Sequence, residues 1–208
     1  MKLILLGKPG SGKGTQAEKI AVEFGIPQIS AGVLLRKIEK DDTPLGREVK
    51  SHIDKGSLVP DELVIKMIFE RLQDSDCKKG YILDGFPRTV NQAEKLDEKI
   101  KIDKVIDIDI PDDVIVNRMA NRRSCLKCGA TYNLLTKKPK KDEICDVCGT
   151  KLTIRADDNP ETVRNRLKIY NENTKPLIEH YKKKKLLVTV DGNRAIDVIF
   201  EDVKKILK

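Results

Sequence analysis

A short apolar run leading directly into a glycine-rich turn is the feature that most constrains the fold of this 208-residue chain. MKLILL is followed by GKPGSGKGT, in which Gly7, Gly12 and Lys13 fit the phosphate-binding pattern G-x-x-x-x-G-K-[ST]. Gly14 follows the lysine, so the hydroxyl group comes one residue late, at Thr15. A strand, a turn of this kind and a helix together collect backbone N–H groups and the positive end of the helix dipole. The segment therefore predicts a loop that holds phosphate, with Lys13 reaching the terminal phosphates.

The rest of the chain alternates between short apolar runs and amphipathic helical stretches. The expected strands are residues 3–6, 26–30, 81–84, 105–110 and 186–190, and the expected helices are residues 13–24, 61–73, 90–100, 112–123, 160–185 and 195–207. Strands that alternate with helices predict an α/β fold with a parallel, doubly wound sheet. Together with the glycine-rich turn, the alternation predicts the phosphate-loop (P-loop) NTPase type of parallel β-sheet, flanked by helices.

Two segments interrupt this alternation. Residues 31–60 are helical and polar, with breaks at Pro44 and Gly56, and they predict a small helical insert. Residues 124–156 contain four cysteines, several lysines and turn-forming residues, but no long apolar pattern. A segment of this composition cannot bury a core of its own size, so it needs another source of stability.

The cysteines of the second segment predict a metal site. Cys125-x2-Cys128 and Cys145-x2-Cys148 are separated by 16 residues, a spacing typical of four-cysteine zinc sites. Four thiolates complete a tetrahedron and leave no position for water, so we expect the zinc ion to be structural. Two disulfide bonds are the alternative, and a cytosolic chain disfavours them.

Composition points to a soluble protein with anionic partners. The formal charge of +8 suits nucleotides as well as nucleic acids. No apolar run reaches 18 residues, and the run LILL is too short for a signal peptide. We therefore expect a cytoplasmic protein that does not bind a membrane.

A zinc-ribbon protein that binds nucleic acid is the alternative from another class. Such a protein needs aromatic side chains for base stacking and a basic stripe near the zinc ion. Tyr132 is the only aromatic residue between the cysteine pairs, and Asp142, Glu143 and Asp146 balance the lysines there. We therefore expect no nucleic-acid partner.

Several blocks of sequence resemble those of adenylate kinases and related nucleoside monophosphate kinases, and they extend along nearly the whole chain. The blocks are GKPGSGKGT (7–15), GIPQISAG (25–32), LVPDELV (58–64), LDGFPRTVNQA (83–93), NRR (121–123) and ADDNPETVRNRL (156–167). The resemblance implies reversible phosphoryl transfer from ATP, with Mg²⁺, to AMP, which gives two molecules of ADP. It also implies a monomer by family default, although nothing in the residues excludes an assembly.

The resemblance divides the chain into three parts. It implies a core at residues 1–30, 61–121 and 157–208, a monophosphate-binding insert at residues 31–60, and a zinc-binding lid over ATP at residues 122–156. Water competes with the acceptor in such a reaction, so the insert and the lid are expected to close over the substrates.

The resemblance also assigns residues to the two nucleotides. The implied ATP site consists of Gly10, Ser11, Gly12, Lys13, Gly14, Thr15, Arg118, Arg122, Thr131, Tyr132 and Arg194. The implied AMP site consists of Ala31, Arg36, Ser57, Leu58, Val59, Gly85, Phe86, Pro87, Arg88, Gln92, Arg155 and Arg166. Within these sets, Arg118 and Arg194 lie at the ATP adenine, Arg36 and Arg88 hold the AMP phosphate, and Gln92 reads the edge of the AMP adenine.

The implied catalytic residues surround the transferring phosphoryl group, and they are Lys13, Asp84, Arg88, Arg122, Arg155 and Arg166. Asp84 ends an apolar strand, which is where P-loop enzymes carry the carboxylate that organises Mg²⁺ and its waters. Arg118 and Arg122 are four residues apart, so they are expected on one face of the helix at 112–123. Arginine suits this task because its planar fork pairs with two phosphate oxygens and keeps its charge.

One block departs from the family pattern. Ala31, Gly32 and Val33 stand where the family usually has Thr, Gly and Asp. The missing threonine hydroxyl removes a polar contact near the acceptor base, and loss of such a bond relaxes discrimination. Our hypothesis is a looser acceptor choice, and a kinase that prefers UMP, CMP or GMP is the alternative.

Overall fold

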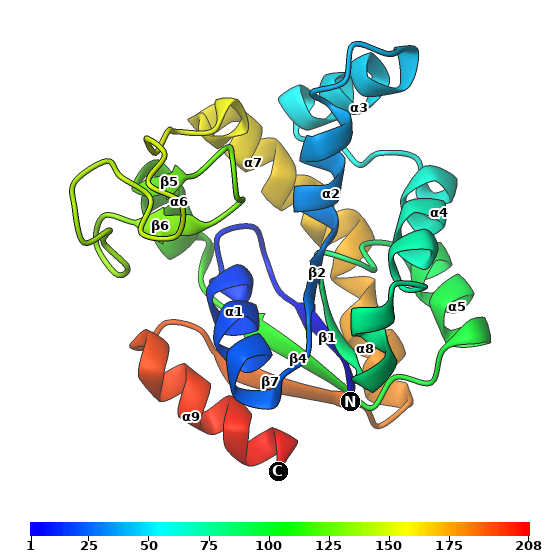
Figure 1. Cartoon of the computed structure of the whole chain (residues 1–208). Helices are drawn as coiled ribbons and strands as arrows, with labels where there is room; N and C mark the ends of the chain where they lie inside the picture. The colour runs from blue at the N-terminus through cyan, green and yellow to red at the C-terminus, as the bar shows by residue number, and fades with distance from the viewer.

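The five apolar runs form one parallel sheet, in a computed structural model that describes residues 1–208 (Figure 1). Its strands are β1 (Lys2–Leu6), β2 (Gln28–Ser30), β3 (Tyr81–Asp84), β4 (Lys104–Asp109) and β7 (Leu187–Asp191), in the spatial order β2-β3-β1-β4-β7. β1 lies at the centre, with Leu5 beside Asp84 of β3 and Leu6 beside Asp107 of β4. The predicted P-loop NTPase type of fold is confirmed.

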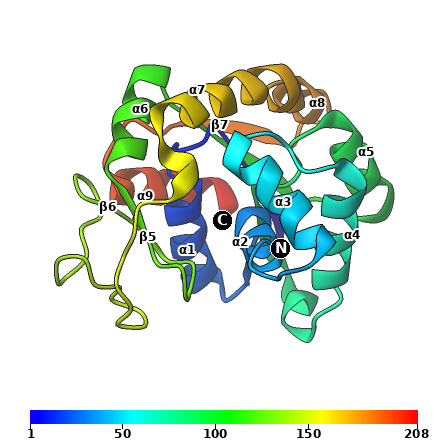
Figure 2. The same ribbon diagram turned by 90° about the horizontal axis from the view of Figure 1, so that it is seen from above.

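Helices cover both faces of this sheet, which explains why its strands read as continuous apolar runs. On one face, α1 (Lys13–Phe24) and α9 (Ile196–Leu207) bury Ile20 and Phe200 against β1 and β4. On the other face, α4 (Asp61–Arg71), α5 (Val90–Lys99) and α8 (Pro176–Lys183) pack Ile68, Leu96 and Tyr181 against Leu83 and its neighbours. Figures 1 and 2 show these two layers of helices around the sheet.

The expected helix at residues 160–185 is wrong as a single element. The structure has α7 (Pro160–Ile169), a π-helical turn at Tyr170–Thr174, and α8. Pro176 has no backbone N–H, and its ring interferes with the carbonyl four residues earlier, so the α-helix cannot run through this position. The wider turn closes with a hydrogen bond of 2.8 Å from the N–H of Lys175 to the carbonyl of Tyr170.

The expected helix at residues 112–123 ends earlier, and this overturns the shared helix face predicted for Arg118 and Arg122. α6 spans Asp112–Ala120, whereas Arg122 belongs to β5 (Arg122–Ser124), which pairs antiparallel with β6 (Thr131–Asn133). The backbone after α6 gains ladder hydrogen bonds from β6, and these replace the last helical turn. The four-residue spacing of Arg118 and Arg122 predicted one helix face wrongly, because the spacing alone does not indicate that a hairpin begins at Arg122.

The two interrupting segments both lie above the carboxyl ends of the strands (Figures 1 and 2). Residues 31–60 form α2 (Ala31–Ile38) and α3 (Pro44–Lys55). The side chain of Thr43 caps the start of α3, where Pro44 fits because its missing N–H is not needed, and Gly56 ends the helix in a left-handed conformation. The cysteine-rich segment contains the β5–β6 hairpin. None of the helices combines the length and the apolar character that a membrane span requires.

Candidate active site

The glycine-rich turn joins the end of β1 to the start of α1. Gly7 has a φ of 134°, and a Cβ at this position would lie 2.5 Å from the carbonyl oxygen of Ile108 in β4. Only glycine allows the loop to lie this close to the neighbouring strand. The Nζ atom of Lys13 donates hydrogen bonds of 2.6 Å and 2.7 Å to the carbonyls of Gly7 and Lys8, so the ammonium group is held over the loop.

Lys8 fixes this loop to the start of α6, a role for which the sequence carries no local signal. Its Nζ atom lies 2.7 Å from a carboxylate oxygen of Asp112 and 2.8 Å from the carbonyl of Ile110, at the start of α6. The loop is therefore tied to the residues that follow β4 and to the helix that carries Arg118.

Asp84 lies beside the loop at the end of β3, as predicted. Its carboxylate accepts a hydrogen bond of 2.9 Å from Nε2 of Gln28. A Cβ added to Gly14 would lie 3.7 Å from the same carboxylate oxygen, so this glycine leaves room between the loop and the acid. Thr15 lies in the first turn of α1, as expected. A carboxylate and a hydroxyl beside a phosphate loop are ligands that suit a magnesium ion carried by a triphosphate.

Three arginines converge on two buried aspartates, Asp157 and Asp158, that carry no local sequence signal of this role. Asp157 accepts hydrogen bonds of 2.8 Å from both Arg36 and Arg166. Asp158 accepts from two nitrogens of Arg122, with Nε at 2.7 Å, and lies close enough to Arg166 for an ion pair. Arg155 precedes the two aspartates in the chain, and its Nε donates a hydrogen bond of 2.7 Å to the hydroxyl of Ser124. Arg166 is only nine residues from Asp157, but Arg36 and Arg122 come from elements that are distant in the sequence, so the fold is needed to reveal the cluster.

The cluster holds more positive than negative charge. Burial, and then the nearby charge of Arg122, lower the pKa of Arg155 and Arg166 below the ordinary value for arginine. Burial alone would raise the pKa of Asp157, but Arg166 and Arg36 outweigh it, so the pKa lies below its usual value. The excess of buried guanidinium groups favours a multiply charged anion at this position.

Arg88 lies at the end of a tight turn that begins at Gly85. Gly85 has a φ of 74°, and its carbonyl accepts a hydrogen bond of 2.9 Å from Nε of Arg88. The carbonyl of Arg88 accepts a hydrogen bond of 2.8 Å from Thr174 in the π-helical turn. The widened turn therefore helps to position this arginine, which is consistent with the frequent occurrence of π-turns at functional sites.

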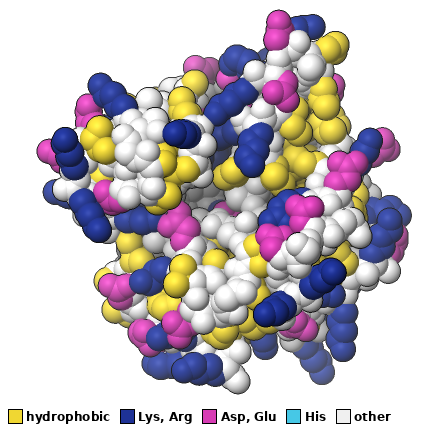
Figure 3. All heavy atoms as spheres, in the orientation of Figure 1, with side chains coloured by type: hydrophobic (Ala, Val, Ile, Leu, Met, Phe, Trp, Pro, Cys, Tyr) yellow, Lys and Arg dark blue, Asp and Glu magenta, His cyan; other side chains and the backbone are white.

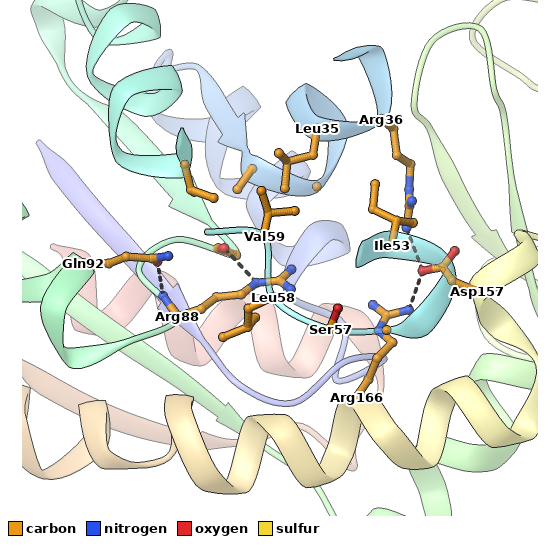
Figure 4. A pocket seen from close by; sticks show the side chains of 15 residues that line it. Leu35, Arg36, Ile53, Ser57, Leu58, Val59, Arg88, Gln92, Asp157 and Arg166 are labelled. Atoms are coloured by element: carbon orange, nitrogen blue, oxygen red, sulfur yellow. Dashed lines mark hydrogen bonds and ion pairs between the residues drawn. The ribbon is translucent and has the colours of Figure 1, made fainter. Parts of the chain in front are cut away.

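Two pockets meet at this arginine cluster. The larger one is the central hollow that Figure 3 shows between the lid side and the α2–α3 side. It is lined by every residue predicted for the ATP site and by all six predicted catalytic residues. The smaller pocket, drawn in Figure 4, is lined by Ala31, Arg36, Ser57, Leu58, Val59, Gly85, Arg88, Gln92 and Arg166 of the predicted AMP set. Arg36, Arg88 and Arg166 line both pockets.

The remaining predicted AMP residues lie elsewhere. Pro87 and Arg155 line the larger hollow. Phe86 lines neither pocket, because its ring is fully buried in the core beneath α5.

Of the predicted ATP residues, Tyr132 lines the hollow but is only 5% exposed. Its hydroxyl accepts a hydrogen bond of 2.8 Å from the N–H of Asp146.

The two residues predicted at the ATP adenine, Arg118 and Arg194, both line the larger hollow. Arg118 donates hydrogen bonds of 3.3 Å to the carbonyl of Ser11 and 3.0 Å to the carbonyl of Gly192. Arg194 is paired with Asp202 at 2.9 Å. Burial lowers the pKa of Arg118, although the nearby Asp191 acts in the opposite direction.

The two residues that depart from the family pattern have different surroundings. Ala31 is 2% exposed and lines the smaller pocket. Val33 instead faces the lid, where a Cβ added to Gly129 would lie 3.4 Å from one of its methyl groups. Nearby, Lys40 donates a hydrogen bond of 2.6 Å to the carbonyl of Leu126. An apolar contact thus stands where a carboxylate was expected.

The four cysteines of the lid form one cluster, with their sulfur atoms within 4.8 Å of one another. The Sγ atoms of Cys125 and Cys148 are 3.4 Å apart, and those of Cys128 and Cys145 are 3.5 Å apart, so neither pair is a disulfide. The first cysteine of each pair forms the same backbone turn, because Cys125 and Cys145 each accept 2.9 Å hydrogen bonds from the glycine four residues on. In a tetrahedral site with Zn–S bonds of about 2.3 Å the sulfurs lie about 3.8 Å apart, so this set fits a zinc ion.

Comparisons with known proteins agree with this geometry. The sequence model of the family described as Adenylate kinase matches residues 5–186. The Adenylate kinase of Lachnospira eligens is 50% identical over 212 aligned residues, which cover 100% of both chains. Those of Methanosarcina acetivorans and Archaeoglobus fulgidus are 51% and 50% identical, and each alignment covers 100% of this chain and 98% of the relative. Matches of this extent show that the chain belongs to the adenylate kinase family, phosphotransferases that act on nucleoside monophosphates.

Proposed function

We propose that this chain transfers the terminal phosphoryl group of MgATP to AMP, reversibly, so that two molecules of ADP form. The observation that carries this proposal is the contact between two pockets through shared arginines. One pocket contains the P-loop, the other contains Gln92, and Arg36, Arg88 and Arg166 line both. An enzyme that hydrolysed ATP would need only the first pocket.

In this proposal the acceptor supplies its own nucleophile. A monophosphate oxygen is already anionic near neutral pH, so no general base is needed. The chain must place the two phosphates in line and neutralise the charge that they share. Lys13 and the arginines lining both pockets are the groups proposed for this work, because their charges are fixed before the substrates arrive. Asp157 and Asp158 hold several of these guanidinium groups in place.

The binding roles follow the two pockets. The P-loop from Gly10 to Thr15 is proposed to hold the ATP phosphates, with Arg118 and Arg194 against its adenine, and with Thr131 and Tyr132 contributing from the lid. In the smaller pocket, Arg36 and Arg88 are proposed to hold the AMP phosphate, and Gln92 its adenine. Phe86 is proposed to contact AMP through its backbone only, because its side chain is buried in the core.

Two metal ions are part of the proposal. Asp84 and Thr15 would hold Mg²⁺ together with the ATP phosphates, and the ion would neutralise charge during transfer. The cysteine cluster would hold a structural Zn²⁺ ion, whose binding free energy would stabilise a lid that has few buried apolar groups. Only Tyr132 and Leu152, with two of the cysteines, form the buried core of this segment.

We propose that the chain consists of three parts, and that two of them move relative to the third during the reaction. The core would be residues 1–30, 61–121 and 157–208, and the moving parts would be the insert at 31–60 and the lid at 122–156. The contacts between Val33 and Gly129, and between Lys40 and Leu126, join these moving parts directly. Their closure would exclude water, the competing acceptor. A monomer is proposed as the working unit.

The acceptor choice is proposed to be looser than in a strict adenylate kinase. Ala31 offers no hydroxyl in a buried position of the smaller pocket. A kinase that prefers UMP, CMP or GMP is the second candidate function, and the observation that favours it is again the missing hydroxyl at Ala31.

Initial rates with MgATP and each of AMP, CMP, UMP and GMP test both candidates, with zinc content measured on the same sample. The proposal predicts the highest kcat/KM for AMP, measurable transfer to a second base, and one zinc ion per chain. A preference for another base would favour the second candidate. An AMP preference as strong as about 10⁴-fold over all three would contradict the looser choice.

A further inference from the structure

The residue proposed to read the AMP adenine, Gln92, is held from behind by a carboxylate outside the pocket. We propose that Asp61 is a positioning residue that locks the Gln92 amide in the one orientation that accepts adenine and rejects guanine-like bases. This inference rests on the proposed function, because it concerns the acceptor site of that reaction.

Both ends of the Gln92 amide are bonded to the protein. Nε2 donates a hydrogen bond of 2.7 Å to Oδ1 of Asp61. Oε1 accepts a hydrogen bond of 2.7 Å from the backbone N–H of Arg88, and Figure 4 shows this contact beside the pocket. Gln92 is 2% exposed and lines the pocket, whereas Asp61 does not line it.

The chemistry of these two partners permits only one orientation. A carboxylate can only accept a hydrogen bond, and a backbone N–H can only donate one. If the amide of Gln92 turned by 180°, its oxygen would face the Asp61 carboxylate and its nitrogen would face the Arg88 N–H. Two hydrogen bonds would become two repulsive contacts in a buried place, where unpaired polar groups are costly.

Asp61 is itself held firmly. It is the first residue of α4, and its Oδ2 atom accepts hydrogen bonds of 2.7 Å from Thr89 and 2.9 Å from Asn91. Thr89 also caps α5, since its hydroxyl accepts a hydrogen bond of 3.1 Å from the N–H of Gln92. The carboxylate therefore joins the starts of two helices and cannot turn away from Gln92 without losing these bonds.

The locked amide keeps one free N–H on Nε2 and one free lone pair on Oε1. The edge of adenine presents an acceptor at N1 and a donor at the 6-amino group, so it complements this pair. Hypoxanthine and guanine present a donor at N1 and an acceptor at O6, which is the reverse order. In the same position they would place like groups against the amide at both points. AMP and IMP are the sharpest pair of probes, because they differ only at this edge.

The first test uses the unmodified enzyme with MgATP and three acceptors: AMP, IMP and purine riboside 5′-monophosphate. The last of these keeps the N1 acceptor but lacks the 6-amino group. The lock predicts that kcat/KM for AMP exceeds that for IMP by about 100-fold or more, with the purine riboside compound in between. Equal kcat/KM values for AMP and IMP would overturn the inference that the Gln92 amide is held in one orientation.

The second test changes the partner of the Gln92 amide with the substitution Asp61→Asn. The new amide can donate as well as accept, and its carbonyl is drawn to Thr89 and Asn91, so its NH₂ group turns toward Gln92. The ratio of kcat/KM for AMP to that for IMP should fall about tenfold or more. The kcat for AMP should stay within about threefold, because Asp61 touches no phosphate. An unchanged ratio in a folded D61N enzyme would overturn the inference.

Asn91→Ala is the matched control, since it removes a hydrogen bond to Asp61 without touching Gln92, and it should keep the original ratio. If D61N does not fold, equal kcat/KM values for AMP and IMP in the unmodified enzyme would still overturn the inference. Equilibrium binding of AMP and IMP without ATP separates the two proposals. Tight binding of AMP and weak binding of IMP without any transfer would support the lock while contradicting the proposed function.

Discussion

At the scale of single residues, the polar side chains of the site are held in place by hydrogen bonds and ion pairs with other groups of the protein. Asp157 and Asp158 hold three arginines, Asp61 holds Gln92, and Lys13 is held by carbonyls of its own loop. Groups that are pre-positioned in this way need little rearrangement when charge develops between two phosphates.

The protonation of Lys13 gives a prediction at this scale. Burial lowers its pKa to about 8, although the charge of Asp84 acts in the opposite direction. A lysine is charged below its pKa, so the form that attracts phosphate is lost from the free enzyme as the pH rises through 8. We expect kcat/KM for MgATP to fall about tenfold per pH unit above this point, measured between about pH 6.5 and 10.

Lys13→Arg keeps its charge throughout this range, so it should lack this fall even if its activity is lower at every pH. Lys13→Met should lose about 10²- to 10³-fold in kcat at pH 7, as expected for the loss of one pre-positioned charge. A kcat/KM that stays level up to pH 10 in the unmodified enzyme would contradict the assigned role.

The sequence could predict the residues that we propose to bind phosphate but not the residues that hold them. Lys13, Asp84 and Arg88 lie in local patterns with a recognisable spacing. Asp157 stands 121 positions from Arg36 and Asp61 stands 31 positions from Gln92, and neither pairing is written in a local pattern. Such partners become visible only when the fold brings distant elements together.

At the scale of elements, the strands and the helix ends with local signals were predictable, and the departures have local causes. Pro44 and Gly56 marked the limits of α3, because one suits a helix start and the other a helix end. The π-helical turn before Pro176 and the β5–β6 hairpin were missed, because the apolar pattern does not register a wider turn or a short polar strand pair. Because the hairpin was not predicted, Arg122 was expected in a helix, whereas it lies in β5.

The lid gives a prediction at the element scale. Cys145→Ser removes one of two buried thiolates from the cluster, so zinc should be lost and Tm should fall by about 5–10 °C. The KM for ATP should rise, because Thr131 and Tyr132 lie in the same segment. Cys77→Ser is the control, since Cys77 is outside the cluster, and it should keep the zinc content. Full zinc content in C145S with an unchanged Tm would contradict a metal-stabilised lid.

At the scale of the whole molecule, the parallel sheet presents the P-loop and Asp84 at one edge, and the insert and the lid meet above that edge. Besides the contacts of Val33 and Lys40, an ion pair joins Glu18 of α1 to Lys137 of the lid. In the proposed function, closure of both parts over two substrates would favour transfer to a second nucleotide over transfer to water.

The most direct measurement follows ATP labelled in its γ-phosphate, with Mg²⁺, in the presence and absence of AMP. The account predicts that with AMP the label appears in the β-phosphate of ADP, and that without AMP almost no free phosphate is released. Release of labelled phosphate at a similar rate in both reactions would contradict the account, and so would the absence of labelled ADP when both nucleotides are present.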